Sequence, residues 1–335
     1  MNKPDFITGA TGIVGRELVV QLINSGRSVI ALRRENSDVN SIEKLIPANS
    51  PLKWVMGDLN NSESLEKAML GCSRIFHTAA IVSFHPDDAK NIISNNAEGT
   101  ANVVNAALHT GVKDFIHVSS VFALGHIEDE LITENTPFEE SDGVTDYARS
   151  KYKAELEVWR GQEEGLNVAV VNPTIIMGAG DFKRSSSELF SQIDAGIPLY
   201  PQGSNGYVSS ADVAKACIIL ADNRVWGERF ILNSENLKYK DLIRSVAQAL
   251  NTKPPAKPIR PWMVGIVWRA FWLLEKLTGK RALATKDSLS MAQLNMSYNG
   301  TKIEKVLLQI DIKWVYEPVS IAIERTASAY LSASN

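Results

Sequence analysis

The chain has 335 residues and a mass of 36.8 kDa, enough for roughly two domains of about 150 residues each. Hydrophobic residues make up 44% of the chain and charged residues 22%, which excludes the disordered and fibrous classes of protein. Lys and Arg number 35 and Asp and Glu 38. The resulting net charge of −3 provides no broad basic field, so nucleic acid is not an expected partner.

The cysteines, the histidines and the apolar runs indicate in which compartment the protein is expected and whether it is expected to bind a metal. Cys72 and Cys217 lie far apart in the sequence, which argues against a disulfide framework or a cysteine-ligated zinc site. The five histidines have no metal-ligand spacing, so no metal is expected. No signal-peptide pattern is present, and the charge-free runs at 165–180 and 195–211 are too short to cross a membrane. We therefore expect a cytoplasmic protein without a membrane partner.

The first half of the chain alternates short strands with longer helices. The expected strands are residues 5–8, 28–32, 52–56, 74–77, 115–118 and 168–171. The expected helices are residues 12–25, 62–70, 91–110 and 147–164. Because strands that alternate with helices join through right-handed crossovers, we predict an α/β fold with a doubly wound parallel sheet.

The second half of the chain is less regular. Residues 178–206 are rich in Gly, Ser and Pro and are expected to be mainly loop. The remaining expected elements are helices at 212–221 and 239–250, a strand at 228–232, a proline-stiffened connector at 252–261, and a helical region at 262–335. Mass and pattern together predict a second, smaller unit after about residue 173.

Three glycines at intervals of three residues lie between the first expected strand and the first expected helix. Gly9 permits a tight turn, Gly12 lets the backbone approach a pyrophosphate, and Gly15 lets the helix pack against the sheet. In this strand–turn–helix context the pattern predicts a dinucleotide-binding turn, in which Thr11 and Ile13 also contact the cofactor. An ordinary glycine-rich turn is the alternative.

The end of the second strand bears on the type of dinucleotide. A carboxylate at this position would hydrogen-bond the ribose 2′-hydroxyl of NAD. This chain has Arg33 and Arg34 there instead, followed by Glu35. Guanidinium groups favour a 2′-phosphate through charge-assisted hydrogen bonds, so the sequence favours NADP(H), with NAD(H) as the alternative.

Tyr147 and Lys151 lie four residues apart, on one face of an expected helix. A nearby ammonium and a positively charged nicotinamide ring would both favour the phenolate and lower the pKa of the tyrosine. Tyr298 and Lys302 have the same spacing, but only the first pair follows a strand that ends in a serine, Ser120. The ends of parallel strands are where ligands bind, so we expect Tyr147 to be the reactive tyrosine.

Together these motifs resemble the extended branch of the short-chain dehydrogenase/reductase family, in family order from residue 5 to residue 332. The similarity is greatest to its dihydroflavonol-4-reductase and 3β-hydroxysteroid dehydrogenase branch. The resemblance implies a Rossmann fold, and residues 208–232 are expected to return to its sheet. The predicted NAD(P)-binding domain is therefore residues 1–172 and 208–232, with a smaller, mostly helical substrate domain of residues 173–207 and 233–335.

The resemblance also implies roles for individual residues. Tyr147 would be the general acid or base, Ser120 would position the substrate carbonyl, and Lys151 would hold the cofactor ribose. The other implied roles are adenine contact for Asp58 and Leu59, ribose contact for Ala79 and Ala80, support of the proton relay for Asn96, and nicotinamide contact for Pro173 and Thr174. It further suggests a homodimer formed through the helices that hold Asn96 and Tyr147.

Three functions remain open at this point. The preferred one is hydride transfer between NADP(H) and the carbonyl or secondary alcohol of a small, largely apolar substrate. The alternative is a nucleotide-sugar epimerase or dehydratase, but such enzymes commonly have an arginine where this chain has residues 204–207. A cofactor-sensing protein without catalysis is the third, and the complete set of Ser120, Tyr147 and Lys151 argues against it.

A tryptophan-rich segment at 262–277 has only a narrow polar stripe. Trp262, Trp268 and Trp272 fall within eleven residues of one another, beside several aliphatic residues. This pattern favours a helix buried in the second domain. A helix that lines the substrate site and a helix on a membrane surface are the alternatives.

Overall fold

A seven-stranded parallel sheet forms the centre of the protein, whose computed structural model describes residues 3–125, 129–141, 143–183, 185–279, 281–282 and 284–334. The strands are β1 (Asp5–Thr8), β2 (Val29–Arg33), β3 (Leu52–Met56), β4 (Arg74–His77), β5 (Asp114–Val118), β7 (Asn167–Pro173) and β11 (Glu228–Leu232). Their spatial order is β11-β7-β5-β4-β1-β2-β3, and every neighbouring pair is parallel. This is the doubly wound α/β fold that the sequence predicts.

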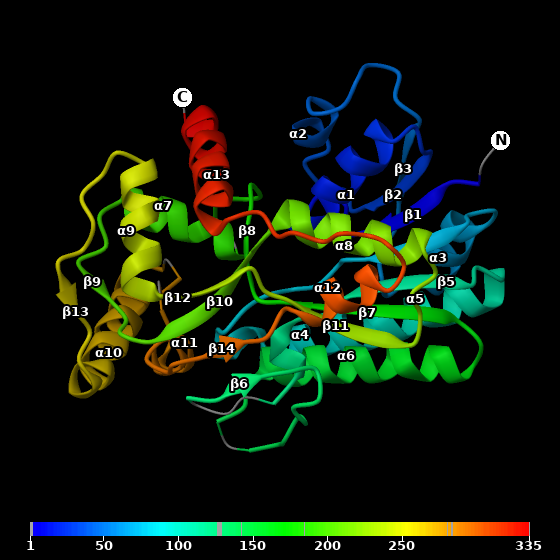
Figure 1. The fold of residues 1–335 in the computed structure, drawn as a ribbon. Coiled ribbons are helices and arrows are strands. Elements are labelled where there is room, and N and C mark those ends of the chain that lie inside the picture. Colours follow the sequence, from blue (N-terminus) through cyan, green and yellow to red (C-terminus); the bar gives the residue numbers. More distant parts are fainter. Residues whose placement is uncertain are drawn as a thin grey trace.

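Helices cover both faces of this sheet (Figure 1). On one face lie α1 (Ile13–Asn24) and α8 (Ser210–Asp222), which pack against each other. On the other lie α3 (Ser62–Met69), α5 (Gly99–Thr110) and α6 (Asp146–Glu163). The strands are buried between these layers because their residues are apolar on both sides, as in β1, where Ile7 packs into one layer and Phe6 into the other.

A second lobe lies at the side of the sheet where β8 and β10 are drawn in Figure 1. Its three-stranded sheet contains β8 (Ile175–Met177), β10 (Ser204–Ser209) and β12 (Glu235–Lys238). Three helices, α7 (Glu188–Asp194), α9 (Tyr239–Ala249) and α13 (Val319–Ser334), share a separate apolar core with this sheet. Residues 210–232 form α8 and β11, which lie with the large sheet. The boundary expected between residues 207 and 208 falls inside β10, a strand of the small sheet. The division of the chain into two domains stays a prediction.

The remaining elements are short or peripheral. They are α2 (Asn40–Glu43), α4 (Ala89–Ile93), α10 (Pro261–Thr278), α11 (Lys286–Met291) and α12 (Lys302–Leu308), the strand pairs β6 (Leu131–Ile132) with β14 (Ser297–Tyr298) and β9 (Leu199–Tyr200) with β13 (Lys257–Pro258), and the turns η1 (Pro86–Asp88), η2 (Ser94–Glu98), η3 (Val121–Ala123) and η4 (Ser185–Ser187). None of the helices in the described part of the chain is long and apolar enough to cross a membrane.

Four expectations need correction. The helix expected at 91–110 is interrupted by η2, a π-helical turn. The segment 178–206 contains α7 and β9 as well as loop, and the C-terminal region contains the strand β14. The tryptophan-rich helix α10 has no buried residue, so the interpretation of it as a buried helix is wrong. The short strands β9 and β14 pair with β13 and β6, and α7 packs against α9. These partners are distant in sequence, so local periodicity does not predict such elements.

Candidate active site

The predicted site residues follow the carboxyl ends of six of the parallel strands. In strand order these residues are Gly9 after β1, Arg33 at the end of β2, Asp58 after β3, Ala79 after β4, Ser120 after β5 and Thr174 after β7. Parallel strands present all these ends at one edge of the sheet. The fold therefore brings segments from across the first 174 residues to one edge.

The glycine-rich turn fits a dinucleotide pyrophosphate. Gly9 has φ +69°, and a Cβ there would lie 2.6 Å from the backbone nitrogen of Ala79, so only glycine fits. Gly12 is the N-cap of α1 and supplies no side-chain cap to the amides of the first turn. Those amides are therefore free to bind an anion, as at other helix N-termini. Thr11 and Ile13 flank this position and are half-buried.

The loop after β8 approaches the same turn. A Cβ on Gly178 or on Gly180 would lie 2.9 Å or 2.6 Å, respectively, from side-chain carbons of Ile13. Both glycines thus allow the second lobe to pack directly against the predicted cofactor turn. Pro173 ends β7 and is buried, and the Thr174 hydroxyl donates to the carbonyl of Leu232 at 3.2 Å.

The two arginines lie where a 2′-phosphate would be recognised. Arg33 is the last residue of β2 and is half-buried, and Arg34 is exposed. The backbone amide of Arg34 donates to the Ser37 hydroxyl at 3.0 Å, which shapes the turn after the strand. Among the described residues neither guanidinium has an ion-pair partner. Asp58 and Leu59 follow the neighbouring strand, where the Asp58 carboxylate accepts from the amide of Asn60.

Tyr147 lies in the first turn of α6, which the Thr145 side chain caps. Its ring is buried, with Phe84 and Phe122 edge-on at centroid distances of 5.6 Å each. Burial raises the pKa of the Tyr147 phenol to about 12, and a hydrogen bond from the Ser120 hydroxyl opposes that rise. In the protein alone, burial therefore outweighs the groups expected to lower this pKa.

Lys151 is one helical turn further along α6. Its ammonium is fully buried and donates to the carbonyl of Val118, the last residue of β5, at 2.9 Å. Burial lowers the pKa of Lys151 to about 8, although the charge of Glu155 opposes this. Ser120 sits between strand and helix, where its hydroxyl also accepts from the amide of Phe122 at 3.2 Å. The structure thus brings Ser120, Tyr147 and Lys151 together at the end of β5.

Asn96 lies in the π-helical turn η2 and is buried. Its side-chain amide donates to the Ile81 carbonyl and to the Ser150 hydroxyl, both at 2.9 Å, while its side-chain oxygen accepts from the Ile81 amide at 2.8 Å. These three bonds fix the loop after β4, which holds Ala79 and Ala80, against α6. Asn96 therefore positions the helix that carries Tyr147.

Two buried histidines lie next to this cluster. The imidazole of His77 hydrogen-bonds the hydroxyls of Thr8 and Thr100 at 2.6 Å and 2.9 Å, and Thr100 in turn donates to the carbonyl of Asn96. His117 stacks on His77 with ring centroids 5.2 Å apart. Burial, assisted by the charge of Lys151, lowers the pKa of His77 to about 3 and that of His117 far below its ordinary value. Both are therefore neutral at physiological pH.

An apolar cavity opens beside the helix that carries Tyr147. Its lining residues are Val121, Phe122, Leu124, Gly125, Phe138, Glu139, Gly143, Val144, Thr145, Ala148, Asn205, Met291, Leu294, Met296 and Tyr298. The lining is mainly hydrophobic, and Glu139 is the one carboxylate among its described residues. Two features of the site were not predicted from the sequence: Phe84, which contacts the Tyr147 ring, and the side of the cavity formed by Met291, Leu294 and Met296. No local pattern marks these residues. Phe122, by contrast, lies two residues after Ser120, and this proximity is a local signal for its place at the site.

Residues 6–232 match the NAD dependent epimerase/dehydratase family. The chain belongs to this family. The match runs from β1 to the last residue of β11 and so includes the whole central sheet. As a member of the epimerase/dehydratase family, the protein is an NAD(P)-dependent oxidoreductase of the extended short-chain dehydrogenase/reductase type, as its motifs predict. Among the described residues no cluster of His, Cys, Asp or Glu could hold a metal ion.

Relatives within the epimerase/dehydratase family differ in activity. The chain is 29% identical over 308 residues to a putative dihydroflavonol 4-reductase from Synechocystis sp., covering 89% of this chain and 87% of the relative. It is 25% identical over 296 residues to UDP-glucose 4-epimerase from Vibrio cholerae, covering 83% and 86%. The crystal structure of gox2253 matches with a TM-score of 0.82 and 30% identity over 99% of each chain. Membership alone therefore does not distinguish a reductase from an epimerase.

Proposed function

We propose that the protein is an NADP(H)-dependent reductase or dehydrogenase, acting on the carbonyl or secondary alcohol of a small, largely apolar substrate. The observation that carries the proposal is an apolar cavity whose lining includes Phe122, which contacts the Tyr147 ring, and Val121, which directly follows Ser120. A dihydroflavonol-4-reductase-like activity is consistent with the Synechocystis relative. Apolar walls favour such a substrate because they bury its surface, while a few polar groups orient the reacting carbon.

The proposed reaction divides the work between cofactor and protein. A bound nicotinamide supplies or accepts the hydride. In the reductive direction the Tyr147 phenol would donate a proton to the carbonyl oxygen, and a raised pKa keeps that phenol protonated beforehand. The Ser120 hydroxyl would hydrogen-bond the same oxygen and orient it. The Lys151 ammonium would hold the ribose and favour the phenolate as it forms.

NADP(H) is the proposed cofactor because Arg33 and Arg34 lie at the end of β2 without an ion-pair partner among the described residues. A 2′-phosphate would form charge-assisted hydrogen bonds with these guanidinium groups. We expect Arg33→Ala to lower kcat/KM for NADPH about tenfold while kcat/KM for NADH changes little. An equal loss with both cofactors would contradict the preference for NADP(H).

The alternative function is epimerisation or dehydration of a nucleotide sugar with a recycled cofactor. It is favoured by the Vibrio relative, but the described residues that line the cavity include no arginine or lysine for a substrate diphosphate. An absorbance assay separates the two. We expect NADPH consumption with small aromatic or alicyclic ketones and no turnover of UDP-glucose. Interconversion of UDP-sugars without net NADPH consumption would instead establish the alternative.

A further inference from the structure

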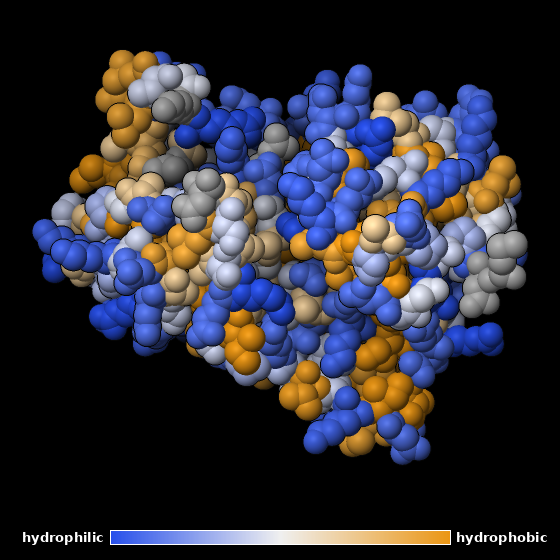
Figure 2. All heavy atoms as spheres, turned by 90° about the horizontal axis from the view of Figure 1, so that it is seen from above, coloured by the Kyte–Doolittle hydropathy of each residue, from blue (hydrophilic) through white to orange (hydrophobic). Residues whose placement is uncertain are grey.

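Helix α10 exposes large apolar side chains to solvent along its whole length. It has no buried residue, and the exposed fraction is 66% for Trp262, 61% for Ile266 and 74% for Leu277. In Figure 1 the helix lies at the outer end of the second lobe, and Figure 2 shows a mainly hydrophobic projection at that end of the molecule. A patch of this kind on a protein surface marks an interaction site.

The exposed residues form one continuous stripe. At about 100° per residue, Trp262, Ile266, Leu273 and Leu277 fall within about 60° of one another around the helix. The opposite face, which includes Phe271, is half-buried against the molecule. The stripe therefore points outward, and the fold of this chain leaves it uncovered.

The same region concentrates positive charge. Residues 253–286 contain eight of the 35 Lys and Arg residues but only one of the 38 Asp and Glu residues. This segment therefore has a net charge of +7, whereas the remainder of the chain has −10. Arg269 and Lys276 are exposed and lie beside the apolar stripe, and Lys257 and Arg260 precede the helix and are also exposed.

We propose that α10 docks on the surface of an anionic lipid bilayer, with the stripe of Trp262, Ile266, Leu273 and Leu277 in the interface and the flanking basic residues against lipid phosphates. Apolar contact and attraction to anionic headgroups act together in such helices, and long basic side chains reach the headgroups. The expectation that a membrane is not a partner rests on the lack of a spanning segment, which a surface helix does not need.

A second copy of this chain fits the same surface poorly. A two-fold interface brings each patch against itself, so two segments of net charge +7 would face each other. The homodimer suggested by the sequence also involves other helices, those that hold Asn96 and Tyr147. Charge complementarity therefore favours a lipid surface over self-association at α10.

Two polar contacts link α10 to the active-site loop. Glu275 pairs with the imidazole of His85 at 3.1 Å, and Arg281, just beyond the helix, forms two hydrogen bonds with Asp88 at 2.6 Å and 2.8 Å. Phe84, next to His85, contacts the Tyr147 ring. A docked α10 would thus hold this loop near the lipid. If the proposed function is correct, an apolar substrate dissolved in the bilayer would have a short route to the cavity.

The test is co-sedimentation of the full chain with vesicles of phosphatidylcholine alone and of phosphatidylcholine with phosphatidylserine. We expect sedimentation with the phosphatidylserine vesicles only, and a blue shift of tryptophan emission on binding. The triple variant Ile266→Gln, Leu273→Gln, Leu277→Gln should lose sedimentation. Arg269→Gln with Lys276→Gln should weaken partitioning about fivefold for each charge removed.

The matched control is Leu308→Gln with Val315→Gln, which removes exposed apolar side chains outside α10 and should leave sedimentation unchanged. Equal circular dichroism spectra would establish that each variant is folded. A wild-type chain that stays in the supernatant, or a triple variant that sediments equally well, would overturn the proposal. So would a wild-type dimer that the triple variant converts to monomer. Sedimentation requires no turnover, so its outcome is independent of the proposed reaction.

Discussion

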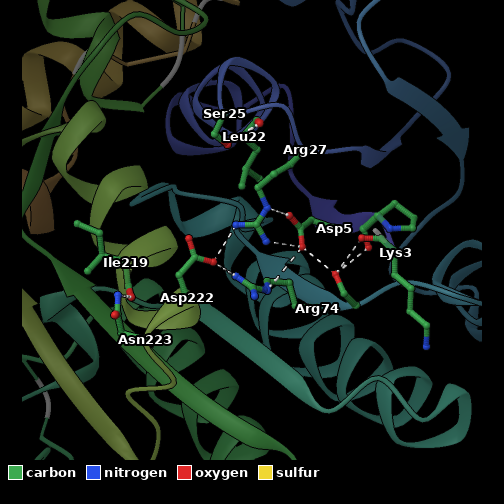
Figure 3. A network of polar contacts seen from close by, with 11 residues as sticks. Lys3, Asp5, Leu22, Ser25, Arg27, Arg74, Ile219, Asp222 and Asn223 are labelled. Atoms are coloured by element: carbon green, nitrogen blue, oxygen red, sulfur yellow. Dashed lines mark hydrogen bonds and ion pairs between the residues drawn. The ribbon is translucent and has the colours of Figure 1, made fainter. Parts of the chain in front are cut away.

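Both edges of the central sheet bury charged side chains, but they neutralise them differently. At the amino edge, Asp5 is 1% exposed and pairs with Arg27 at 2.8 Å and with Arg74 at 3.6 Å (Figure 3). Asp222 at the end of α8 pairs with the same two arginines. At the carboxyl edge, Lys151 is equally buried, yet among the described residues its ammonium has a single hydrogen-bond partner, the backbone carbonyl of Val118.

The difference separates stabilisation from reactivity. At the amino edge, burial still raises the pKa of Asp5, but two arginines and Ser73 act against that rise. The network ties β1, β4 and α8 together far from the glycine turn. At the carboxyl edge, burial shifts the pKa values of Tyr147 and Lys151 toward their neutral forms with little compensation. Strongly shifted groups of this kind concentrate where proteins bind and transform ligands.

The largest expected effect is at the carboxyl edge. Tyr147→Phe removes the proposed proton donor while keeping the ring between Phe84 and Phe122, so turnover should fall about 10³-fold. NADPH affinity, measured by isothermal titration calorimetry, should change little. Tyr152→Phe, on the same helix, is the matched control and should retain full turnover. Unchanged turnover in Tyr147→Phe would contradict the proposed role.

At the amino edge, a substitution should lower stability and leave turnover unchanged. Arg27→Met leaves the buried Asp5 carboxylate with Arg74 and the Ser73 hydroxyl as its described partners, so the free energy of unfolding in urea should fall by about 3 kcal/mol. Turnover per folded molecule should not change, since the pair lies at the opposite edge from the glycine turn. Arg325→Met breaks the exposed pair with Glu317 and should cost at most about 0.5 kcal/mol. Equal losses in the two variants would mean that burial adds nothing to the Asp5 network.

The candidate residues at the carboxyl edge could be named from the sequence because they belong to local motifs. Gly9, Ser120 and Tyr147 each stand at a fixed place relative to a strand or helix, and a parallel sheet brings strand ends together whatever the loops between them do. The central sheet was predictable for the same reason, since each of its strands is a short apolar run. The run at 228–232 predicted the strand β11, whereas its place beside β7 is known from the structure alone.

Features that depend on packing between distant segments were not predictable. The cavity joins residues 121–148 to residues 291–298, which no local pattern connects. Arg27 and Asp222 are 195 positions apart, so their pairing at the amino edge had no sequence signal. The outward orientation of α10 was missed because an apolar helix has the same composition whether the fold covers it or leaves it exposed.

Lys151→Met should lower turnover and raise the free energy of unfolding. The pKa of Lys151 is lowered to about 8 in the folded protein, so the unfolded chain binds more protons above that pH and wild-type stability rises as pH increases from about 8 to 10.5. Removing the buried charge should raise the free energy of unfolding at neutral pH by about 2 kcal/mol, after loss of the bond to Val118. Turnover should fall at least tenfold.

The control is Lys153→Met, at an exposed neighbouring position, which should alter neither the free energy of unfolding nor turnover. A less stable Lys151→Met would refute the contrast between the edges.

The smallest expected effect concerns the two buried histidines, His77 and His117, and is seen in how the free energy of unfolding depends on pH. His77 has a folded pKa of about 3 against an ordinary 6.5, so below pH 6.5 the unfolded chain takes up a proton that the native protein does not. Stability is therefore complete above 6.5 and falls with decreasing pH, by about 1.4 kcal/mol per pH unit for each such histidine. His117 adds a second proton of the same sign. His77→Gln should reduce the slope of unfolding free energy against pH by about half between pH 6 and 5. Parallel slopes for His77→Gln and the wild type would show that the carboxyl edge does not hold its histidines neutral.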